Sequence, residues 1–350
     1  MKARLFLQSK KARLAIHREA LDDFIKVIKD LNFETDIAEV ERWKAMAAAD
    51  ESLDLVGYFR IVGKITLPDY TGSAMITYRP LHSQFSAKRF HQDIALKRLT
   101  GQALHEKGIP AQRVLLEGGA KGNNWALTTY IVGNDIGWVF AFDRHLLKEK
   151  LLDDWVKTRQ ALSDLKPMMP KRSVRLKVWR HEFAVRYQNL ERIIGKVQAG
   201  ELSSIFKRSL LQSAERGITH ADLSPNNIIW DGRNFHFIDW GDSHLNTRAV
   251  DWLTLWMYCW QNQRYQRQIE QALLADYPDE KSAAEGILAS EVSLIRRLSK
   301  LAEQVEYFVR SDPERYEQHY QKLDLPNDPR EIVQILSQQY FDLRGRFKLG

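Results

Sequence analysis

The fold is decided by the stretch Gly217-Ile-Thr-His-Ala-Asp-Leu-Ser-Pro-Asn-Asn-Ile-Ile-Trp-Asp-Gly-Arg-Asn-Phe-His-Phe-Ile-Asp-Trp-Gly241. Two short apolar runs, at residues 228–230 and 235–238, flank a polar turn at residues 231–234, a pattern that predicts a β-hairpin. Polar side chains stand at the outer end of each run. They are His220, Asp222 and Asn227 before the first run and Asp239 after the second. We therefore expect the hairpin to carry two carboxylates, a carboxamide and an imidazole at one end.

The spacing His-x-Asp-x-x-x-x-Asn within this stretch is the pattern of a kinase catalytic loop. Phosphoryl transfer needs an acid side chain to orient the acceptor hydroxyl, and oxygen ligands to hold Mg²⁺ on a nucleotide. Three fixed residue types are moderate evidence alone, but two flanking strands and a terminal Asp make a chance match much rarer. The alternative is a capping turn at residues 220–222 followed by an unrelated hairpin. We favour the catalytic hairpin.

The motifs of this stretch resemble the aminoglycoside phosphotransferase and choline kinase-like branch of the protein-kinase-like superfamily. They read His-Ala-Asp-Leu-Ser-Pro-Asn-Asn-Ile-Ile and Phe-Ile-Asp-Trp-Gly, where the family usually has His-Gly-Asp and then Ile-Asp-Phe or Ile-Asp-Trp. The later motif Arg248-Ala-Val-Asp251-Trp-Leu resembles a family helix start whose Asp braces the catalytic loop. Ser224 stands where protein kinases usually have Lys, which favours the small-molecule branch.

The resemblance implies a role for each polar residue of the hairpin. Asp222 would accept or orient the proton of the substrate hydroxyl, and His220 would hold the loop through hydrogen bonds. Asn227 and Asp239 would bind Mg²⁺, a hard cation that usually takes only one or two protein carboxylates beside phosphate and water. Asp242 could be a further ligand, although a solvated acid is the favoured interpretation.

The 350 residues are 44% hydrophobic and 28% charged, enough apolar material for one large or two modest globular domains. The resemblance implies an α+β, two-lobed protein-kinase-like fold, with a small β-rich N-lobe at residues 1–132 and a large α-helical C-lobe at residues 133–350. A single cysteine, Cys259, excludes an intrachain disulfide and suits a reducing compartment. Residues 5–7 are too short for a signal core and no apolar run approaches a membrane span, so we expect a cytoplasmic protein.

Periodicity divides the expected N-lobe into alternating elements. Residues 10–31 carry apolar side chains at helical spacing and predict an amphipathic helix. Residues 53–78 predict strands with a turn at residues 68–72. A helix is expected at residues 85–107, and a second hairpin at residues 114–132. This order of strands, helix and strands is the order of a kinase N-lobe.

The N-lobe residues that would bind the nucleotide phosphates differ from the usual kinase pair. Kinases normally pair a strand Lys with a Glu on the following helix, but Thr77 stands about where the Lys is expected. Arg79, on the same face of the strand, is the preferred substitute because its charge is permanent and it binds phosphate well; Lys88 is the alternative. Asp93 stands near the position of the helix acid. Arg79 as a strand-end cap and Asp93 as a surface acid are given equal weight.

The adenine is expected to contact backbone groups of a strand that resembles the one leading into the family's hinge. Thr129, Tyr130 and Ile131 lie in this strand. The glycine-rich Gly-x-Gly-x-x-Gly pattern is not convincing, because Gly57 and Gly63 are too widely spaced and can mark bulges instead.

The expected C-lobe is helical from residue 146 onward, apart from the catalytic hairpin and residues 167–170, and one of its helices is expected at residues 251–270. Trp252, Trp256 and Trp260 recur every four residues and give a helix one aromatic face. A core helix packed under the active site is favoured over an aromatic wall for a cationic or aromatic substrate. Trp240 is the best single candidate for such a wall.

The net charge of +7 raises the question of a polyanionic partner. Residues 171–181 are rich in Lys and Arg and include a Trp, which makes nucleic acid conceivable. A solvated helical face or a wall of the substrate cleft is favoured, since 45 acidic residues are spread along the chain.

These patterns predict an ATP- and Mg²⁺-dependent phosphotransferase that moves the γ-phosphate to a hydroxyl of a small or medium-sized acceptor, a small molecule or sugar being favoured. The alternatives are an acceptor that is a protein, a lipopolysaccharide sugar or a tRNA, or a nucleotide-binding pseudokinase or nucleic-acid-binding regulator. The presence of Asp222, Asn227 and Asp239 argues against a pseudokinase.

Overall fold

The chain divides into two compact units in the computed structural model. Unit 1 comprises Met1–Gly133 and Ile238–Gly241, and unit 2 comprises Asn134–Phe237 and Asp242–Gly350. The structure describes residues 10–42, 59–81, 83, 86–120, 122–136, 145–169, 176–209, 216–311 and 328–349. The expected α+β architecture is confirmed: unit 1 contains an antiparallel sheet with helices, and unit 2 is dominated by helices.

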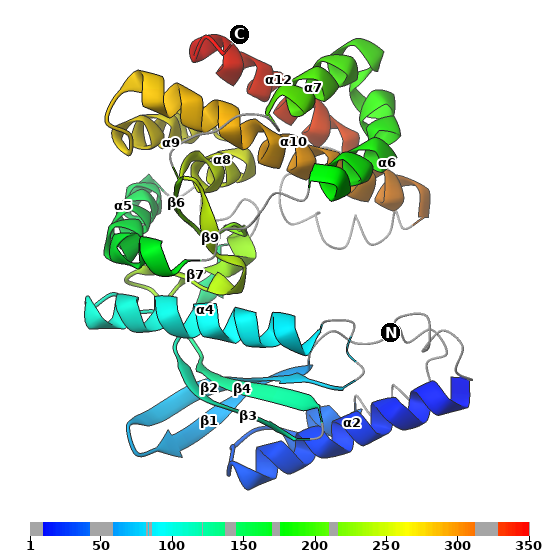
Figure 1. The fold of residues 1–350 in the computed structure, drawn as a ribbon, viewed down its shortest axis with the longest axis vertical. Helices are drawn as coiled ribbons and strands as arrows, with labels where there is room; N and C mark the ends of the chain where they lie inside the picture. The colour runs from blue at the N-terminus through cyan, green and yellow to red at the C-terminus, as the bar shows by residue number, and fades with distance from the viewer. Residues whose placement is uncertain are drawn as a thin grey trace. The chain divides into compact units, whose positions relative to one another are not determined.

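Unit 1 is built around a four-stranded antiparallel sheet in the order β1-β2-β4-β3. The strands are β1 (Phe59–Leu67), β2 (Tyr70–Arg79), β3 (Val114–Ala120) and β4 (Asn123–Thr129). Helix α2 (Lys10–Asp30) lies on one face of the sheet and helix α4 (Ala87–Glu106) on the other (Figure 1). The helices and hairpins predicted for this part of the chain are confirmed within the described residues.

Alternation along β2 gives each face of the sheet its own apolar core. Ile76 points to the α2 face, where it belongs to a buried cluster with Phe24. Thr77 lies opposite Ala126 across the β2–β4 pair, so the two side chains share the other face. Ala126 packs there with Phe90 of α4. The strand position at which a kinase lysine is expected therefore faces α4.

Local signals fix the ends and the close packing of α4. The hydroxyl of Ser86 accepts the N–H of Arg89 at 3.1 Å, which is the usual N-cap bond. Gly108 follows the helix in the left-handed region, with φ at 71°, as is common beyond a helix end. A Cβ at Gly101 would lie 2.3 Å from the carbonyl oxygen of Gln112, so glycine lets α4 approach the chain that enters β3.

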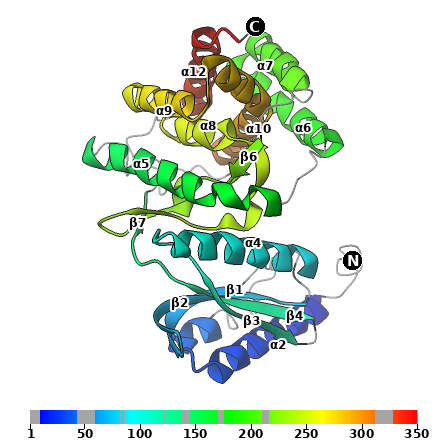
Figure 2. The same ribbon diagram turned by 60° about the vertical axis from the view of Figure 1, so that its left-hand side comes forward.

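Unit 2 is mainly helical, and the long helix α10 packs against α6, α7, α8 and α12 (Figures 1 and 2). Its helices are α5 (His145–Leu162), α6 (Leu176–Ile194), α7 (Lys196–Ser209), α8 (Ala249–Tyr258), α9 (Gln263–Ala275), α10 (Glu280–Ser311) and α12 (Arg330–Arg346). None of the helices in the described part of the chain is both long enough and apolar enough to cross a bilayer.

Five short strands of unit 2 form two small sheets. They are β5 (Asn134–Asp135), β6 (Arg216–Thr219), β7 (Ile228–Trp230), β8 (Phe235–Phe237) and β9 (His244–Thr247). The order is β5-β7-β8 in one sheet, and β6 pairs with β9 in the other. The predicted hairpin is confirmed in β7 and β8, whereas β5, β6 and β9 were not predicted. These strands have two or four residues, too few for apolar alternation to distinguish them from loops.

The single helix predicted around residues 251–270 is wrong, because the chain breaks there into α8 and α9. Asn262 caps the new helix by accepting the N–H of Tyr265 at 2.9 Å. The core-helix interpretation is confirmed for Trp252 and Trp256, which are fully buried in α8 and donate their indole N–H groups to carboxylates. Trp260 is also buried but lies beyond the end of α8. Cys259 is also buried, as expected.

Candidate active site

The predicted catalytic loop of unit 2 lies between β6 and β7 and is braced by a buried carboxylate. Asp251, in the first turn of α8, is fully buried. Its Oδ2 accepts the N–H of His220 at 2.8 Å, and its Oδ1 accepts the N–H of Ala221 at 3.1 Å. Hydrogen bonds to an ionised acceptor are about twice as strong as neutral ones. The bracing role expected for Asp251 is therefore confirmed.

Ala221 itself is held in an unusual backbone conformation. Its φ of 69° lies in the left-handed region, which costs a non-glycine residue about 1–2 kcal/mol. The carbonyl oxygen of Ala221 accepts Nη2 of Arg297, from α10, at 2.8 Å. The N–H and C=O of this residue are thus fixed by Asp251 and Arg297 respectively. These two contacts hold alanine where the resembling family usually has glycine.

The Asp222 carboxylate is accessible and is oriented by its neighbours. Its side chain is 52% exposed, and Nη1 of Arg297 lies 3.8 Å from Oδ1. The amide nitrogen of Asn227 donates to the Asp222 carbonyl at 2.8 Å and, in a longer contact, to Oδ2 at 3.3 Å. Both contacts use the amide nitrogen of Asn227, so neither occupies its amide oxygen Oδ1, an atom that can act as a metal ligand. Arg297 was missed by the sequence analysis.

The turn of the β7–β8 hairpin is closed by Asp231. Its Oδ1 accepts the N–H groups of Arg233 and Asn234, each at 2.7 Å, and Oδ2 lies 2.6 Å from Nε2 of the buried His236. Desolvation raises the pKa of Asp231, but these hydrogen bonds outweigh it and hold the pKa at about 2. The carboxylate is therefore a structural element of the hairpin.

Helix α5 anchors the second strand of the hairpin. Oδ2 of Asp154 accepts the N–H of Phe235 at 3.0 Å. The ring of Trp155 packs on that of Phe237, with 4.8 Å between centroids. The strand that runs into Asp239 is fixed by these contacts at both of its ends.

Asp239 belongs to unit 1, where it forms an ion pair that the sequence analysis did not predict. Nζ of Lys97, on α4, lies 2.7 Å from Oδ1 of Asp239 and 3.3 Å from Oδ2 of Asp93. The Lys97 side chain is only 6% exposed. The available signal was the i,i+4 spacing of Asp93 and Lys97 on a predicted helix. Asp93 is therefore a half-buried partner of the buried Lys97 and not an isolated surface acid.

The backbone after Asp239 fits closely against α4. A Cβ at Gly241 would lie 1.1 Å from Oδ1 of Asp93, so only glycine leaves room for that carboxylate. Trp240 is 2% exposed. A side chain so deeply buried packs in the interior, and the alternative of Trp240 as a substrate wall is not favoured.

Arg79 is buried at the end of β2 and bonded to the turn between β3 and β4. Its Nη1 donates to the carbonyl oxygen of Gly122 at 3.1 Å and to Oδ1 of Asn124 at 3.2 Å. These are the contacts of a residue that caps a strand end, the alternative considered for Arg79. Lys88, the other basic candidate, is exposed in the first turn of α4. A phosphate-binding role for either residue stays a prediction.

The predicted hinge residues differ in how their backbone groups are used. The N–H of Thr129 donates to the carbonyl of Arg113 at 2.9 Å, and that of Tyr130 donates to a β2 carbonyl at 2.9 Å. Within the described part of the chain, neither Ile131 nor Val132 has a hydrogen bond. Their N–H and C=O groups can therefore pair with a ligand such as adenine.

A resident metal cluster is absent among the described residues, where no group of three or more His, Cys, Asp or Glu side chains could hold an ion. Mg²⁺ that enters with a nucleotide needs only one or two protein carboxylates. Asp239, with a 38% exposed side chain, and the amide oxygen of Asn227 are donors of the required kind. Each residue by itself has the oxygen chemistry that Mg²⁺ prefers.

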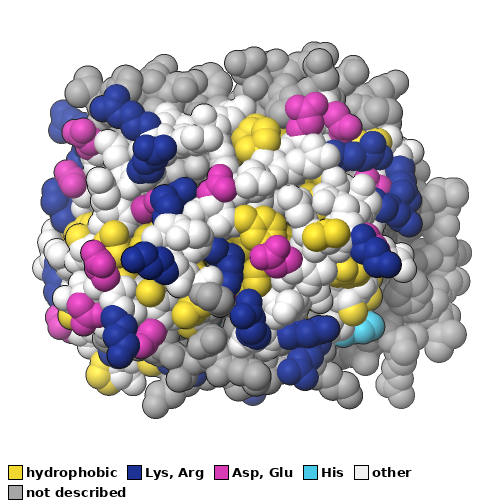
Figure 3. Space-filling view, turned by 90° about the horizontal axis from the view of Figure 1, so that it is seen from above, with side chains coloured by type: hydrophobic (Ala, Val, Ile, Leu, Met, Phe, Trp, Pro, Cys, Tyr) yellow, Lys and Arg dark blue, Asp and Glu magenta, His cyan; other side chains and the backbone are white. Residues whose placement is uncertain are grey.

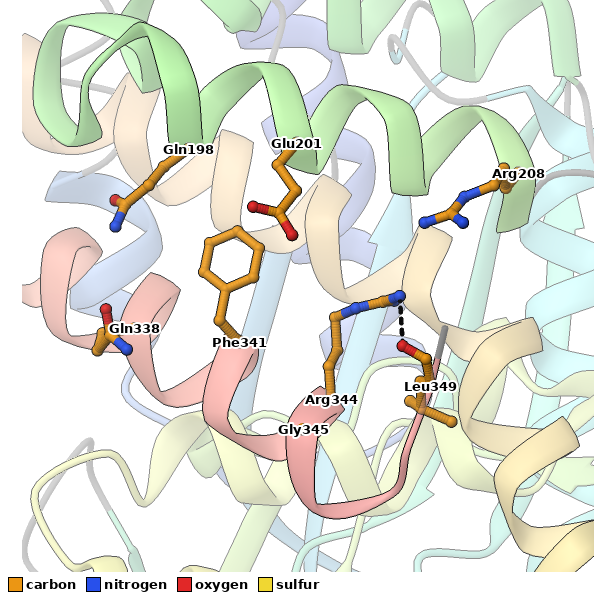
Figure 4. Close-up of a pocket in the computed structure, with 8 residues that line it drawn as sticks. All are labelled: Gln198, Glu201, Arg208, Gln338, Phe341, Arg344, Gly345 and Leu349. Atoms are coloured by element: carbon orange, nitrogen blue, oxygen red, sulfur yellow. Dashed lines mark hydrogen bonds between the residues drawn. The ribbon is translucent and has the colours of Figure 1, made fainter.

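Unit 2 contains a cavity of about 470 Å³ that none of the predicted site residues lines. It is lined mainly by α7 and α12, with Phe341 and Arg344 directed from α12 toward α7 (Figure 4). Arg344 is committed to a buried ion pair with Glu291 and donates to the carbonyl oxygen of Leu349 at 2.9 Å. The charge of Arg344 is therefore neutralised within the protein by Glu291.

The basic segment 171–181 is described only in part, since residues 171–175 lie outside the described residues. In α6, the ring of Trp179 is covered by the guanidinium of Arg296, 4.2 Å from the ring centroid. Basic and acidic side chains are interspersed on the face seen in Figure 3. Nucleic-acid binding stays a prediction that is not favoured.

The sequence profile of APH, the phosphotransferase enzyme family, matches residues 78–285, more than half of the chain. No curated protein gives a significant match. Aminoglycoside phosphotransferase APH(4)-Ia is 11% identical, with a TM-score of 0.48 over 86% of this chain and 98% of that one. A choline/ethanolamine kinase family protein from Mesorhizobium loti is 14% identical, with a TM-score of 0.49 over 81% of this chain and 92% of that one.

Proposed function

Because this chain belongs to the phosphotransferase enzyme family, we propose that it transfers the γ-phosphate of ATP to a hydroxyl of a small or medium-sized acceptor, with Mg²⁺. The observation that carries the proposal is the catalytic loop, where an exposed Asp222 carboxylate is held by Asn227 and flanked by Arg297. A small molecule or a sugar is the preferred acceptor, in keeping with the branch that the loop motifs resemble. The expected cytoplasmic location stays a prediction.

Asp222 is assigned the role of accepting or orienting the proton of the acceptor hydroxyl. Phosphoryl transfer needs little covalent help from the protein, so placement of this carboxylate matters more than its reactivity. Asn227 fixes its orientation, and Arg297 joins it to the carbonyl oxygen of Ala221. His220 contributes through its backbone, which Asp251 holds.

Asn227 and Asp239 are assigned to Mg²⁺, through the amide oxygen of the first and the carboxylate of the second. The bound ion supplies neutralisation of the phosphate charge. Asp239 has a φ of 64°, and Nζ of Lys97 on α4 orients its carboxylate, at 2.7 Å from Oδ1.

The adenine is assigned to the chain at Thr129, Tyr130 and Ile131. The first two residues anchor the strand through their own N–H groups, and Ile131 presents backbone groups that the described chain does not use. Arg79 and Asp93 remain the residues that sequence reasoning assigns to the phosphate side of the nucleotide.

The test uses the purified full-length chain with Mg²⁺ and ATP labelled at the γ-phosphate. Aminoglycosides, choline, ethanolamine and simple sugars are offered as acceptors, and products are identified by mass spectrometry. We expect transfer to at least one hydroxyl acceptor, and loss of transfer in Asp222→Ala and Asp239→Ala with the fold intact by circular dichroism. Unchanged turnover in both variants would refute the mechanism. Absence of Mg²⁺-dependent ATP consumption, together with salt-sensitive RNA or DNA binding, would favour a nucleic-acid-binding regulator.

A further inference from the structure

Lys97 of α4 is a buried cation that lies between two carboxylates. Its ammonium contacts Asp239 and Asp93, and its side chain is 6% exposed. An ammonium taken out of water is strongly disfavoured unless it is paired, and the carboxylates of Asp93 and Asp239 supply that pairing. The cluster of two acids and one base has a net charge of −1. It opens toward solvent at Asp239, whose side chain is 38% exposed.

The strand position at which kinases carry a phosphate-binding lysine holds no charge in this chain. Thr77 is 4% exposed and lies on the sheet face that α4 covers. Arg79, the one charged residue of β2, is directed to the turn formed around Gly122 and Asn124. The cation of β2 is therefore engaged at the strand end, and the cation beside Asp239 is provided by α4.

The position of Lys97 is fixed by the backbone. Asp93 and Lys97 are one helical turn apart, which places their side chains side by side. Gly241 admits the Asp93 carboxylate where any Cβ would collide with it, so α4 and the chain around Asp239 meet closely. The backbone therefore brings Lys97 and Asp239 close enough for their side chains to pair.

From this arrangement we propose that Lys97 replaces the strand lysine of the kinase fold and binds the nucleotide phosphates. An ammonium has three N–H donors. Among the described residues its partners are Asp93 and Asp239, which take two of them and leave the third for a phosphate oxygen. The pair that kinases build between a strand and a helix is here built within one helix, by Asp93 and Lys97. The inference rests on the proposed function, because it requires a nucleotide.

Titration calorimetry of the full chain with Mg²⁺–ATP and, separately, with adenosine tests this role. Adenosine reports the adenine contacts without the phosphates. In Lys97→Met we expect the Kd for Mg²⁺–ATP to rise about ten-fold or more and that for adenosine to stay within two-fold, since a charge-assisted hydrogen bond is lost only with ATP. Lys97→Arg should recover part of the ATP affinity. The matched control is Arg98→Met, which removes a neighbouring, half-exposed cation paired with Glu117 and should change neither Kd.

Lys97→Met leaves two carboxylates close together and can unfold the chain locally. The double substitution Asp93→Asn with Lys97→Met removes the charges together and should show the same selective loss of ATP affinity. The inference is overturned if ATP affinity is unchanged in both variants, or if ATP and adenosine affinities fall equally. It is also overturned if Arg79→Met, and not Lys97→Met, selectively weakens ATP. A wild-type chain that binds neither ligand would refute the proposed function itself.

Discussion

Replacement of Asp251 by alanine removes the one buried carboxylate that holds two consecutive backbone N–H groups of the catalytic loop. These groups belong to His220 and Ala221 and donate at 2.8 and 3.1 Å. Asp251 is fully buried, so water does not take its place without rearrangement. The substitution is therefore expected to reduce stability and activity together.

The magnitude follows from the two hydrogen bonds. Each bond to a charged acceptor contributes about 1.5–3 kcal/mol, which gives about 3–6 kcal/mol for the pair. If Ala221 leaves the left-handed region in the variant, the release of about 1–2 kcal/mol of strain offsets part of this loss of stability. The expected net loss is about 1–5 kcal/mol, a large share of the ~5–15 kcal/mol that stabilises a typical protein. A displacement of about 1 Å at Asp222 would also lower the transfer rate about 100-fold.

Urea denaturation followed by tryptophan fluorescence measures the stability, and a γ-phosphate transfer assay measures the rate. Asp251→Asn keeps one oxygen acceptor but presents an N–H₂ group to the second N–H, so it should lie between wild type and Asp251→Ala. Glu285→Ala, at an exposed position of α10, is the control and should stay within about 0.5 kcal/mol of wild type. A loss below about 1 kcal/mol in Asp251→Ala, with an unchanged transfer rate, would refute the reasoning.

Three further substitutions test other parts of the account. Ala221→Gly should raise the free energy of unfolding by up to about 1 kcal/mol, since relief of strain exceeds the added entropy of glycine; a clear destabilisation in urea would contradict it. The pKa of Asp231 is lowered to about 2. The ionised carboxylate therefore adds to the free energy of unfolding in full above its ordinary pKa near 3.8, and this contribution is lost as the pH falls toward 2. Asp231→Asn should remove that part of the acid sensitivity in urea midpoints measured from pH 5 to 2, and an identical pH profile would exclude it. Gly241→Ala should lower the unfolding midpoint and weaken ATP binding because its Cβ collides with Asp93; wild-type values for both would show that the fit is loose.

The catalytic loop could be predicted from the sequence because its information is local. His220, Asp222 and Asn227 lie within eight residues, and the hairpin that follows them has its own turn chemistry. The bracing by Asp251 was expected only through the family resemblance, since no periodicity joins residues 31 positions apart.

Arg297 and Lys97 could not be found in the same way. Arg297 lies 76 residues from Ala221, and its contact depends on the packing of α10. Lys97 occupies a position on α4 that would be apolar in a simple amphipathic helix, and only the fold explains why a cation is tolerated there. Strand alternation places Arg79 on the same face as Thr77, but alternation does not reveal that its guanidinium bonds to Asn124 beside the β3–β4 turn.

The central claim, that Asp222 serves the transfer of phosphate and not the binding of nucleotide, is tested most directly by Asp222→Asn. The variant keeps the size of the side chain and can keep its contact with Asn227. The measurement compares the rate of γ-phosphate transfer with the Kd for Mg²⁺–ATP in the variant and the wild type. The account predicts a rate at least about 100-fold lower at an unchanged Kd, since general acid–base catalysis typically contributes about 10²–10⁴-fold. A variant that transfers phosphate at the wild-type rate would contradict it.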